Sequence, residues 1–166
     1  NHSRSFDADA HHALARRAAA ESTVLLKNED NLLPLAAGTK VAVIGDFAET
    51  PRYQGAGSSA VNSIKVDSFL DCLAESGQGK PDAAKQAEAV ALAQKADVVL
   101  LCMGLDEIKE SEGLDRIDMC VASNQIELLR ALQKVNSNIV VVLSAGASVE
   151  TSWANHCKAL VYGALG

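Results

Sequence analysis

Four short runs of apolar residues, many of them β-branched, place the strongest constraint on the fold of this 166-residue chain. The runs are "KVAVIGD" (40–46), "DVVLLCM" (97–103), "NIVVVLSAG" (138–146) and "KALVYGALG" (158–166). Each is continuous rather than alternating, which is typical of strands buried on both faces of a parallel sheet. Together with the helical stretches between them, they predict a three-layer α/β/α sandwich with a mostly parallel, flavodoxin-like sheet.

The expected helices leave a gap in this pattern. Stretches rich in helix-forming residues cover 8–22, 64–76, 80–96 and 124–135. Only "GQGK" separates the second from the third, so no strand is predicted near residues 76–81 and the sheet is expected to be incomplete. An incomplete sheet exposes strand edges that favour pairing between chains, and hence a homo-oligomer.

Charge and cysteine placement exclude several classes of partner. The net charge is −6 and no basic block occurs, which argues against nucleic acid or an anionic membrane as a partner. No apolar run is long enough to span a bilayer. The cysteines form no CxxC pair or zinc-type spacing, so we expect no metal or other cofactor. Four scattered free thiols favour a reducing, cytoplasmic location.

Two unusual loops, 46–63 and 104–122, each follow a predicted buried strand. Because ligands bind beyond the carboxyl ends of parallel strands, the two loops are expected to share one edge of the sheet. The second loop, with "GLDEIKESEGLDRID", is dense in carboxylates. One Glu there could act as a general acid if repulsion or a dry cleft raises its pKa. The alternative is a solvated acidic turn that binds nothing.

The first loop also has two interpretations. Its "QGAGSS" segment could cradle a phosphate in a backbone nest, as in a nucleotide-binding module. It lacks the P-loop lysine and the GxGxxG spacing, however, so the nucleotide signal is weak. As a flexible segment that lets the backbone approach a ligand, it is reasonable.

Six stretches together resemble the C-terminal α/β sandwich domain of family 3 glycoside hydrolases, the β-glucosidase-like enzymes. In order they are "ARRAAAESTVLLKNEDNLLPL", "KVAVIGDFA", "QGAGSSAVN", "ADVVLLCMGLDEIKESEGLDRIDM", "NQIELLRAL" and "VVVLSAGASVETSWA". The resemblance covers about residues 15–166. It implies that residues 1–166 form a single partial domain of a longer protein whose catalytic barrel domain precedes it.

The resemblance also implies a reaction. A retaining, exo-acting β-glycosidase would use an Asp in a Ser-Asp-Trp motif of the barrel as nucleophile, and that motif does not occur here. The "ESEGLDR" motif carries the general acid/base role onto Glu112, with Glu110 as the competitor. Arg52, Tyr53 and Gln54 would border the cleft and contact the saccharide substrate. The fragment alone is expected to be inactive. The alternatives are a nucleotide-binding module and a non-catalytic scaffold.

Two further residues are expected to be structural. Lys27 in "LLKNED" and Trp153 in "ETSWA" could each contact a sugar, but no polar cluster lies next to Trp153 in the sequence. We expect Lys27 to stabilise the fold and Trp153 to pack in it.

Overall fold

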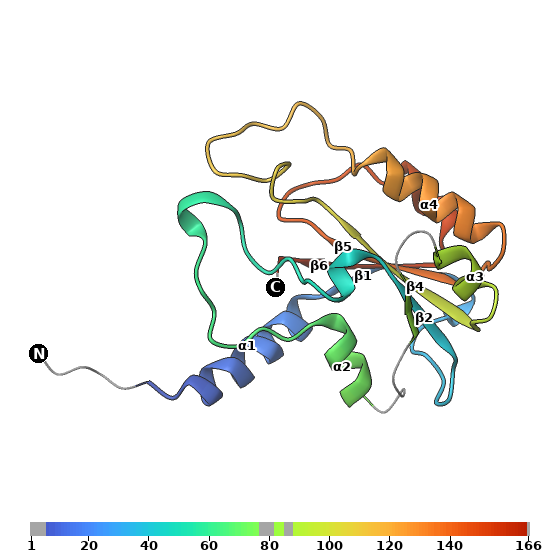
Figure 1. Cartoon of the computed structure of the whole chain (residues 1–166), viewed down its shortest axis with the longest axis horizontal. Helices are drawn as coiled ribbons and strands as arrows, with labels where there is room; N and C mark the ends of the chain where they lie inside the picture. Colours follow the sequence, from blue (N-terminus) through green and yellow to red (C-terminus); the bar gives the residue numbers. More distant parts are fainter. Residues whose placement is uncertain (1–5, 77–81, 85–87, 166) are drawn as a thin grey trace, which may run out of the picture.

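The computed structural model describes residues 6–76, 82–84 and 88–165, with backbone only for 82–84. Within them lies a six-stranded sheet of order β1-β6-β5-β4-β2-β3 (Figure 1). β2 to β6 run parallel and β1 pairs antiparallel with β6, which confirms the mostly parallel sheet. The strands are β1 (Val24–Asn28), β2 (Val41–Ile44), β3 (Asp82–Ala84), β4 (Val98–Gly104), β5 (Ile139–Ser144) and β6 (Ala159–Ala164).

Helices cover both faces of the sheet, so the three-layer sandwich is also confirmed (Figure 1). α1 and α2 lie on one side, and α3 and α4 on the other. β4 contributes alternate residues to the two apolar layers, with Leu101 and Met103 toward α4 and Leu100 and Cys102 toward α2. The α-helices are α1 (Ala8–Ser22), α2 (Phe69–Glu75), α3 (Ala89–Ala93) and α4 (Ser123–Gln133); 3-10 turns occupy Glu29–Asn31, Asp46–Ala48, Gly57–Ser59 and Ser152–His156.

The prediction that the sheet lacks a strand in this region is wrong. Asp82–Ala84, predicted as part of a long helix, form β3 and pair in parallel with Ala42 to Ile44 of β2. The helix that follows is only Ala89–Ala93, while residues 77–81 and 85–87 lie outside the described part. The free edge of β2 offers a row of backbone hydrogen bonds, and satisfying it outweighs a helix propensity that amounts to tenths of a kcal/mol per residue.

The strand order places a switch point beside the two unusual loops. Taking β2 as the first strand of the unit, β3-β2-β4-β5-β6 is the flavodoxin-type order 2-1-3-4-5. The chain leaves β2 toward one neighbour and later returns to the other, so the loops after β2 and β4 diverge from adjacent strand ends. Both loops therefore leave the same edge of the sheet, as expected from the sequence.

Lys27 and Trp153 are structural, as predicted. Trp153 is buried and its indole N–H donates to the Glu150 carbonyl at 2.8 Å. The Lys27 ammonium donates to the carbonyls of Ala154 at 2.8 Å and Cys157 at 2.6 Å. Both side chains thereby fasten the 3-10 turn that precedes β6.

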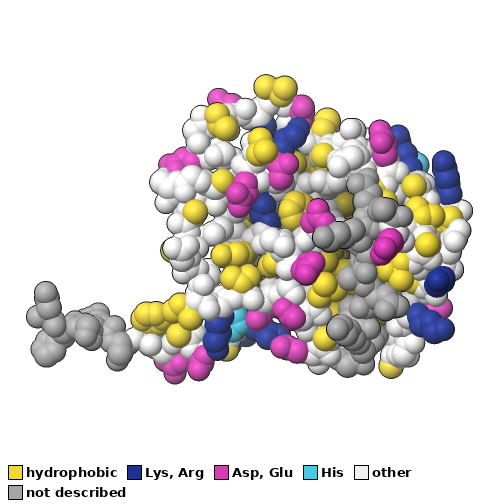
Figure 2. Space-filling model, viewed as in Figure 1, with side chains coloured by type: hydrophobic (Ala, Val, Ile, Leu, Met, Phe, Trp, Pro, Cys, Tyr) yellow, Lys and Arg dark blue, Asp and Glu magenta, His cyan; other side chains and the backbone are white. Residues whose placement is uncertain are grey.

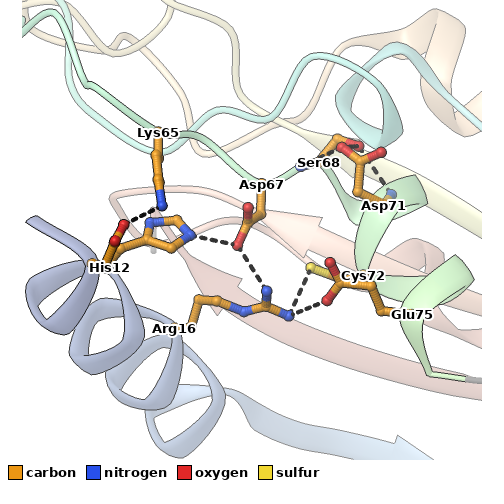
Figure 3. A network of polar contacts seen from close by, with 9 residues as sticks. His12, Arg16, Lys65, Asp67, Ser68, Asp71, Cys72 and Glu75 are labelled. Carbon is orange, nitrogen blue, oxygen red and sulfur yellow. Dashed lines mark hydrogen bonds and ion pairs between the residues drawn. The ribbon is translucent and has the colours of Figure 1, made fainter.

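α1 is attached mainly through polar contacts, because none of its residues is buried. Figure 3 shows these contacts, which we call the α1 network. Arg16 lies 3.3 Å from Asp67 and 2.8 Å from Glu75, and His12 Nε2 lies 3.0 Å from Asp67. Lys65 pairs with Asp9 at the start of the helix. None of the described helices has the length and apolar character needed to cross a membrane.

Candidate active site at the carboxyl rim of the sheet

The loops after β2 (residues 46–63) and β4 (residues 104–122), which we call the two rim loops, border a wide, open hollow of about 550 Å³. Gly55, Ala56 and Ser59 line one side and residues 109–112 and 114–116 the other, and Ala147 from the loop after β5 completes the lining. A backbone bridge between Ala56 and Ser111 continues the parallel pairing beyond the strands. The sequence-based expectation that both loops contribute to one place is therefore confirmed. In Figure 2, acidic and hydrophobic side chains intermingle on the surface of the molecule.

Glu112 projects into this hollow toward Ser58. Its Oε2 accepts hydrogen bonds from the Ser58 backbone N–H at 2.9 Å and from the Ser58 hydroxyl. Gly57 makes this approach possible, because its φ is +87° and an added Cβ would lie 3.0 Å from Glu112 Cβ. The predicted acid/base and the glycine–serine segment are thus in direct contact.

The electrostatics of Glu112 differ from those expected of a general acid. The hydrogen bond from the Ser58 hydroxyl, and then that from the Ser58 N–H, hold the pKa of Glu112 below 4.5. Both bonds stabilise the charged form, while burial opposes them only weakly because the side chain is exposed. In this chain, Glu112 is therefore a carboxylate at neutral pH.

Glu110, the predicted competitor, is held in a buried ion pair. Its Oε2 accepts from Arg52 Nη1 at 2.8 Å and from the Gly146 backbone N–H at 3.0 Å. The two side chains are only 4% (Arg52) and 10% (Glu110) exposed. Because its Oε2 is bound by these partners and the side chain is mostly buried, Glu110 is a poor donor to any substrate in the hollow.

Arg52 has a different role from the one expected. Its guanidinium also donates to the carbonyls of Leu105 at 2.6 Å and Glu110 at 3.2 Å. These contacts join the two rim loops from inside, and Arg52 does not line the hollow that contains Glu112. Burial and internal bonding give the predicted substrate contact of Arg52 no support in this geometry.

Tyr53 and Gln54 also lie outside the lining of that hollow. The Gln54 amide pairs with the backbone of Val61, accepting at 2.9 Å and donating at 3.2 Å, and so closes its own loop. Tyr53 is partly exposed beside a separate apolar hollow of about 400 Å³ on the α2 face of the sheet. Substrate contacts by Tyr53 and Gln54 stay predictions.

Sequence reasoning missed three residues of the site: Ser58, Gly146 and Ala147. Ser58 belongs to the segment singled out for its glycines, but its bond to Glu112 was not anticipated. Gly146 and Ala147 lie in the loop after β5: the Gly146 N–H binds Glu110, and Ala147 lines the hollow. The strand order was the available signal, because β5 neighbours β4. Such a loop lies beside the rim in any sheet with this order.

The nucleotide-binding alternative fits the switch point poorly. A hollow of about 270 Å³ there is lined by Asp46 and Asp106, whose charges oppose a phosphate. Gln125 from the first turn of α4 occupies the end of β4, donating to the Gly104 carbonyl and accepting from the Gly104 N–H at 2.9 Å each. The described residues also hold no cluster of His, Cys, Asp and Glu suited to a metal ion.

Comparisons with known proteins show the family to which this chain belongs. The family described as "Glycosyl hydrolase family 3 C-terminal domain" matches residues 23–166. An exo-α-(1→6)-L-arabinopyranosidase of Bifidobacterium breve is 45% identical over 94% of this chain and 24% of its own length. Thermostable β-glucosidase B of Acetivibrio thermocellus is 40% identical over 97% of this chain and 23% of its own length.

A solved structure shows the same fold. The crystal structure of a family 3 β-glucosidase from Bifidobacterium adolescentis superposes with a TM-score of 0.90 at 46% identity, covering 99% of this chain and 26% of that one. The chain thus spans about a quarter of the length of the relatives that it matches. By sequence and by fold, this chain belongs to the C-terminal domain family of the family 3 glycosyl hydrolases.

Proposed function

We propose that this chain carries the general acid/base of a retaining, exo-acting β-glycosidase, and that Glu112 is that residue. One observation carries the proposal. Glu112 is an exposed carboxylate in the rim hollow that forms no ion pair within the described part of the chain, whereas Glu110 is held by Arg52. The relatives support the reaction class, because their names describe glycosidases acting on different sugars.

The nucleophile would come from a barrel domain of the same protein. No Ser-Asp-Trp motif occurs in these 166 residues, so this chain lacks one of the two carboxylates that a retaining mechanism needs. The acidic loop exposes four large apolar side chains, which fits a surface that another domain covers: Ile108, Leu114, Ile117 and Met119. Four free thiols support a reducing, cytoplasmic location for the protein.

The proposed reaction has two steps. The barrel carboxylate attacks the anomeric carbon, and Glu112 gives its proton to the departing glycosidic oxygen. Glu112, now ionised, then takes a proton from the water that releases the sugar from the nucleophile. The two carboxyl groups would stand about 5–5.5 Å apart. The substrate is a terminal β-linked sugar, and no metal or cofactor takes part in this scheme.

The contact between Glu112 and Ser58 suits the second step and not the first. It stabilises the carboxylate, which is the form needed to activate water. For the first step the proton must stay on Glu112 near neutral pH. Burial against the barrel and the substrate, together with loss of the Ser58 hydrogen bonds, would raise the pKa in that direction.

The test is Glu112→Ala in the full-length glycosidase, assayed with aryl β-glycosides of graded leaving group. General acid catalysis contributes about 10²–10⁴-fold, so kcat/KM should fall by that factor for a poor leaving group. A dinitrophenyl glycoside, which leaves without a proton, should lose much less. Azide should restore turnover by replacing the activated water, with a glycosyl azide of retained configuration as product.

Glu107→Gln is the matched control, since Glu107 is an exposed glutamate of the same loop that does not line the hollow. It should behave like the unaltered enzyme with every substrate. If Glu112→Ala left turnover unchanged, the chain would be a non-catalytic scaffold and the proposal would be wrong. Binding of a nucleotide to this chain would instead favour the alternative module.

A further inference from the structure

The two rim loops and the loop after β5 converge on the buried pair of Arg52 and Glu110. Arg52 comes from the loop after β2, Glu110 from the loop after β4, and the Gly146 N–H from the loop after β5. The Glu110 Oε2 atom accepts from both of the others, at 2.8 Å from Arg52 and 3.0 Å from Gly146. One carboxylate oxygen therefore joins loops from three neighbouring parallel strands.

The same pair fixes the segment that leads to Glu112. Arg52 binds the carbonyl at the end of β4, that of Leu105, and the carbonyl of Glu110, so one guanidinium holds both ends of that segment. Immediately beyond Glu110, Ser111 bridges to Ala56, which lies four residues after Arg52. Glu112 is the next residue along, so little backbone freedom remains between the ion pair and its carboxylate.

Burial gives this arrangement its stiffness. With side chains 4% and 10% exposed, solvent cannot compete for the pair, and the planar guanidinium fork fixes direction as well as distance. Arg52 does not line the hollow. Glu110 does, but its Oε2 is held by Arg52 and the Gly146 N–H, and its side chain is mostly buried. Arg52 Nε and Glu110 Oε1 remain buried without a partner in the described residues, a desolvation cost that the other hydrogen bonds of the pair offset.

The geometry points to Arg52 and Glu110 as positioning residues that hold the Glu112 carboxyl where proton transfer to the glycosidic oxygen occurs. This inference rests on the proposed function. It adds two residues that would act through Glu112 and not by contacting the substrate. A displacement of about 1 Å at a reacting group can lower a rate about 10²-fold, so loss of the pair should affect the proton-dependent step most.

The experiment compares Glu110→Gln and Arg52→Lys with the unaltered full-length glycosidase. Glu110→Gln keeps an oxygen for the Gly146 N–H but removes the charge that binds Arg52. For each variant, kcat/KM is measured with a phenyl and a dinitrophenyl β-glycoside on the same preparation. The ratio of the two values does not depend on the fraction of protein that is folded. We expect kcat/KM for the phenyl glycoside, divided by kcat/KM for the dinitrophenyl glycoside, to fall about 10–100-fold.

Asp118→Asn is the matched control. Asp118 lies in the same loop and is 3.8 Å from Lys109, with both side chains well exposed at 38% (Lys109) and 41% (Asp118). Asparagine keeps the oxygen that accepts the Cys120 N–H. This variant removes an ion pair from the loop without touching the buried one, and its substrate ratio should equal that of the unaltered enzyme.

The outcomes separate the inference from the function on which it rests. If Glu112→Ala lowers the ratio but Glu110→Gln and Arg52→Lys do not, the pair is structural and the inference is overturned. If Glu112→Ala leaves the ratio unchanged, the proposed function fails, whatever the pair does. In support, Glu110→Gln added to Glu112→Ala should cause no further fall in the ratio, because the group that it positions is already gone.

Discussion

The molecule contains two networks of charged side chains that differ in their exposure to solvent. The rim pair, Arg52 and Glu110, has side chains only 4% and 10% exposed, and it joins three loops. In the α1 network, Arg16 is 43% exposed and its partner Glu75 is 60% exposed. Water and salt weaken exposed pairs, whereas a buried pair retains its attraction and leaves a large penalty when one partner is lost.

The difference shows where charge determines geometry in this domain. The rim pair lies at the carboxyl ends of the central strands, next to the residue proposed for catalysis. The α1 network attaches a helix with no buried residue, so that helix has little apolar packing of its own. We expect α1 to open at a lower free energy than the sheet and the rim.

The largest expected effect is on the rim pair. Glu110→Ala removes one partner and leaves the Arg52 guanidinium buried without its counter-charge. We expect the free energy of unfolding to fall by about 3–5 kcal/mol. Urea unfolding of this chain, followed through the fluorescence of its single tryptophan, measures the change. A loss below about 1 kcal/mol would place the pair in the same class as the α1 network.

Two leucines on different helices sharpen the comparison. Leu129 of α4 is fully buried, and Leu14 of α1 is 55% exposed. Leu129→Ala should lower the free energy of unfolding by about 2–5 kcal/mol, through lost apolar burial and the cavity left behind. Leu14→Ala should stay within about 0.5 kcal/mol of the unaltered chain. Equal losses would mean that α1 is packed as firmly as α4.

A smaller effect concerns Glu112, whose contact with Ser58 is exposed and hydrogen-bonded. Ser58→Ala removes the hydroxyl that contributes most to the lowered pKa, so the pKa of Glu112 should rise toward 4.5. A lowered pKa stabilises the fold at pH values above the unfolded-state pKa, and that stability is lost as pH falls through the folded-state pKa. The variant should show less of this acid-dependent loss. Carbon-13 NMR titration of the Glu112 carboxyl measures the pKa directly, and an unchanged value would contradict the account.

The smallest effect is a change of thiol reactivity with salt. Arg16 Nη2 lies 3.9 Å from the Cys72 sulfur in the α1 network, and burial raises the pKa of the Cys72 thiol. Cys102 lies beneath α2, where burial raises its pKa to about 12. Salt at 1 M should screen the ion pairs of the α1 network, so that α1 opens more often and Cys72 becomes accessible. Alkylation of Cys72 should then be a few-fold faster, while Cys102 stays unreactive. Peptide mapping after iodoacetamide treatment separates the two, and a salt-independent rate at Cys72 would mean that packing, not charge, holds α1.

Local patterns predicted the elements that are buried. The run "DVVLLCM" becomes β4, and topology alone placed the loops after β2 and β4 at one edge. β3 was missed because its residues favour a helix locally, and only the free edge of β2 selects a strand. The pair of Arg52 and Glu110 was missed because its members are 58 residues apart and no local pattern links them. Such long-range contacts distinguish the two glutamates of "ESEGLDR": Glu110 is bound by Arg52, whereas Glu112 stays exposed to solvent.

The position of the Glu112 carboxyl with a substrate bound decides whether this residue is the general acid/base. A crystal structure of the full-length protein with a thio-linked disaccharide would measure this directly. We predict that Glu112 is released from Ser58 and that one of its carboxyl oxygens lies within hydrogen-bonding distance of the interglycosidic sulfur, about 2.6–3.2 Å plus an allowance for the larger radius of sulfur. A barrel carboxylate should lie about 5–5.5 Å from Glu112, with the Arg52–Glu110 pair intact. A Glu112 side chain still bound to Ser58, with another acid at the scissile linkage, would contradict the central claim.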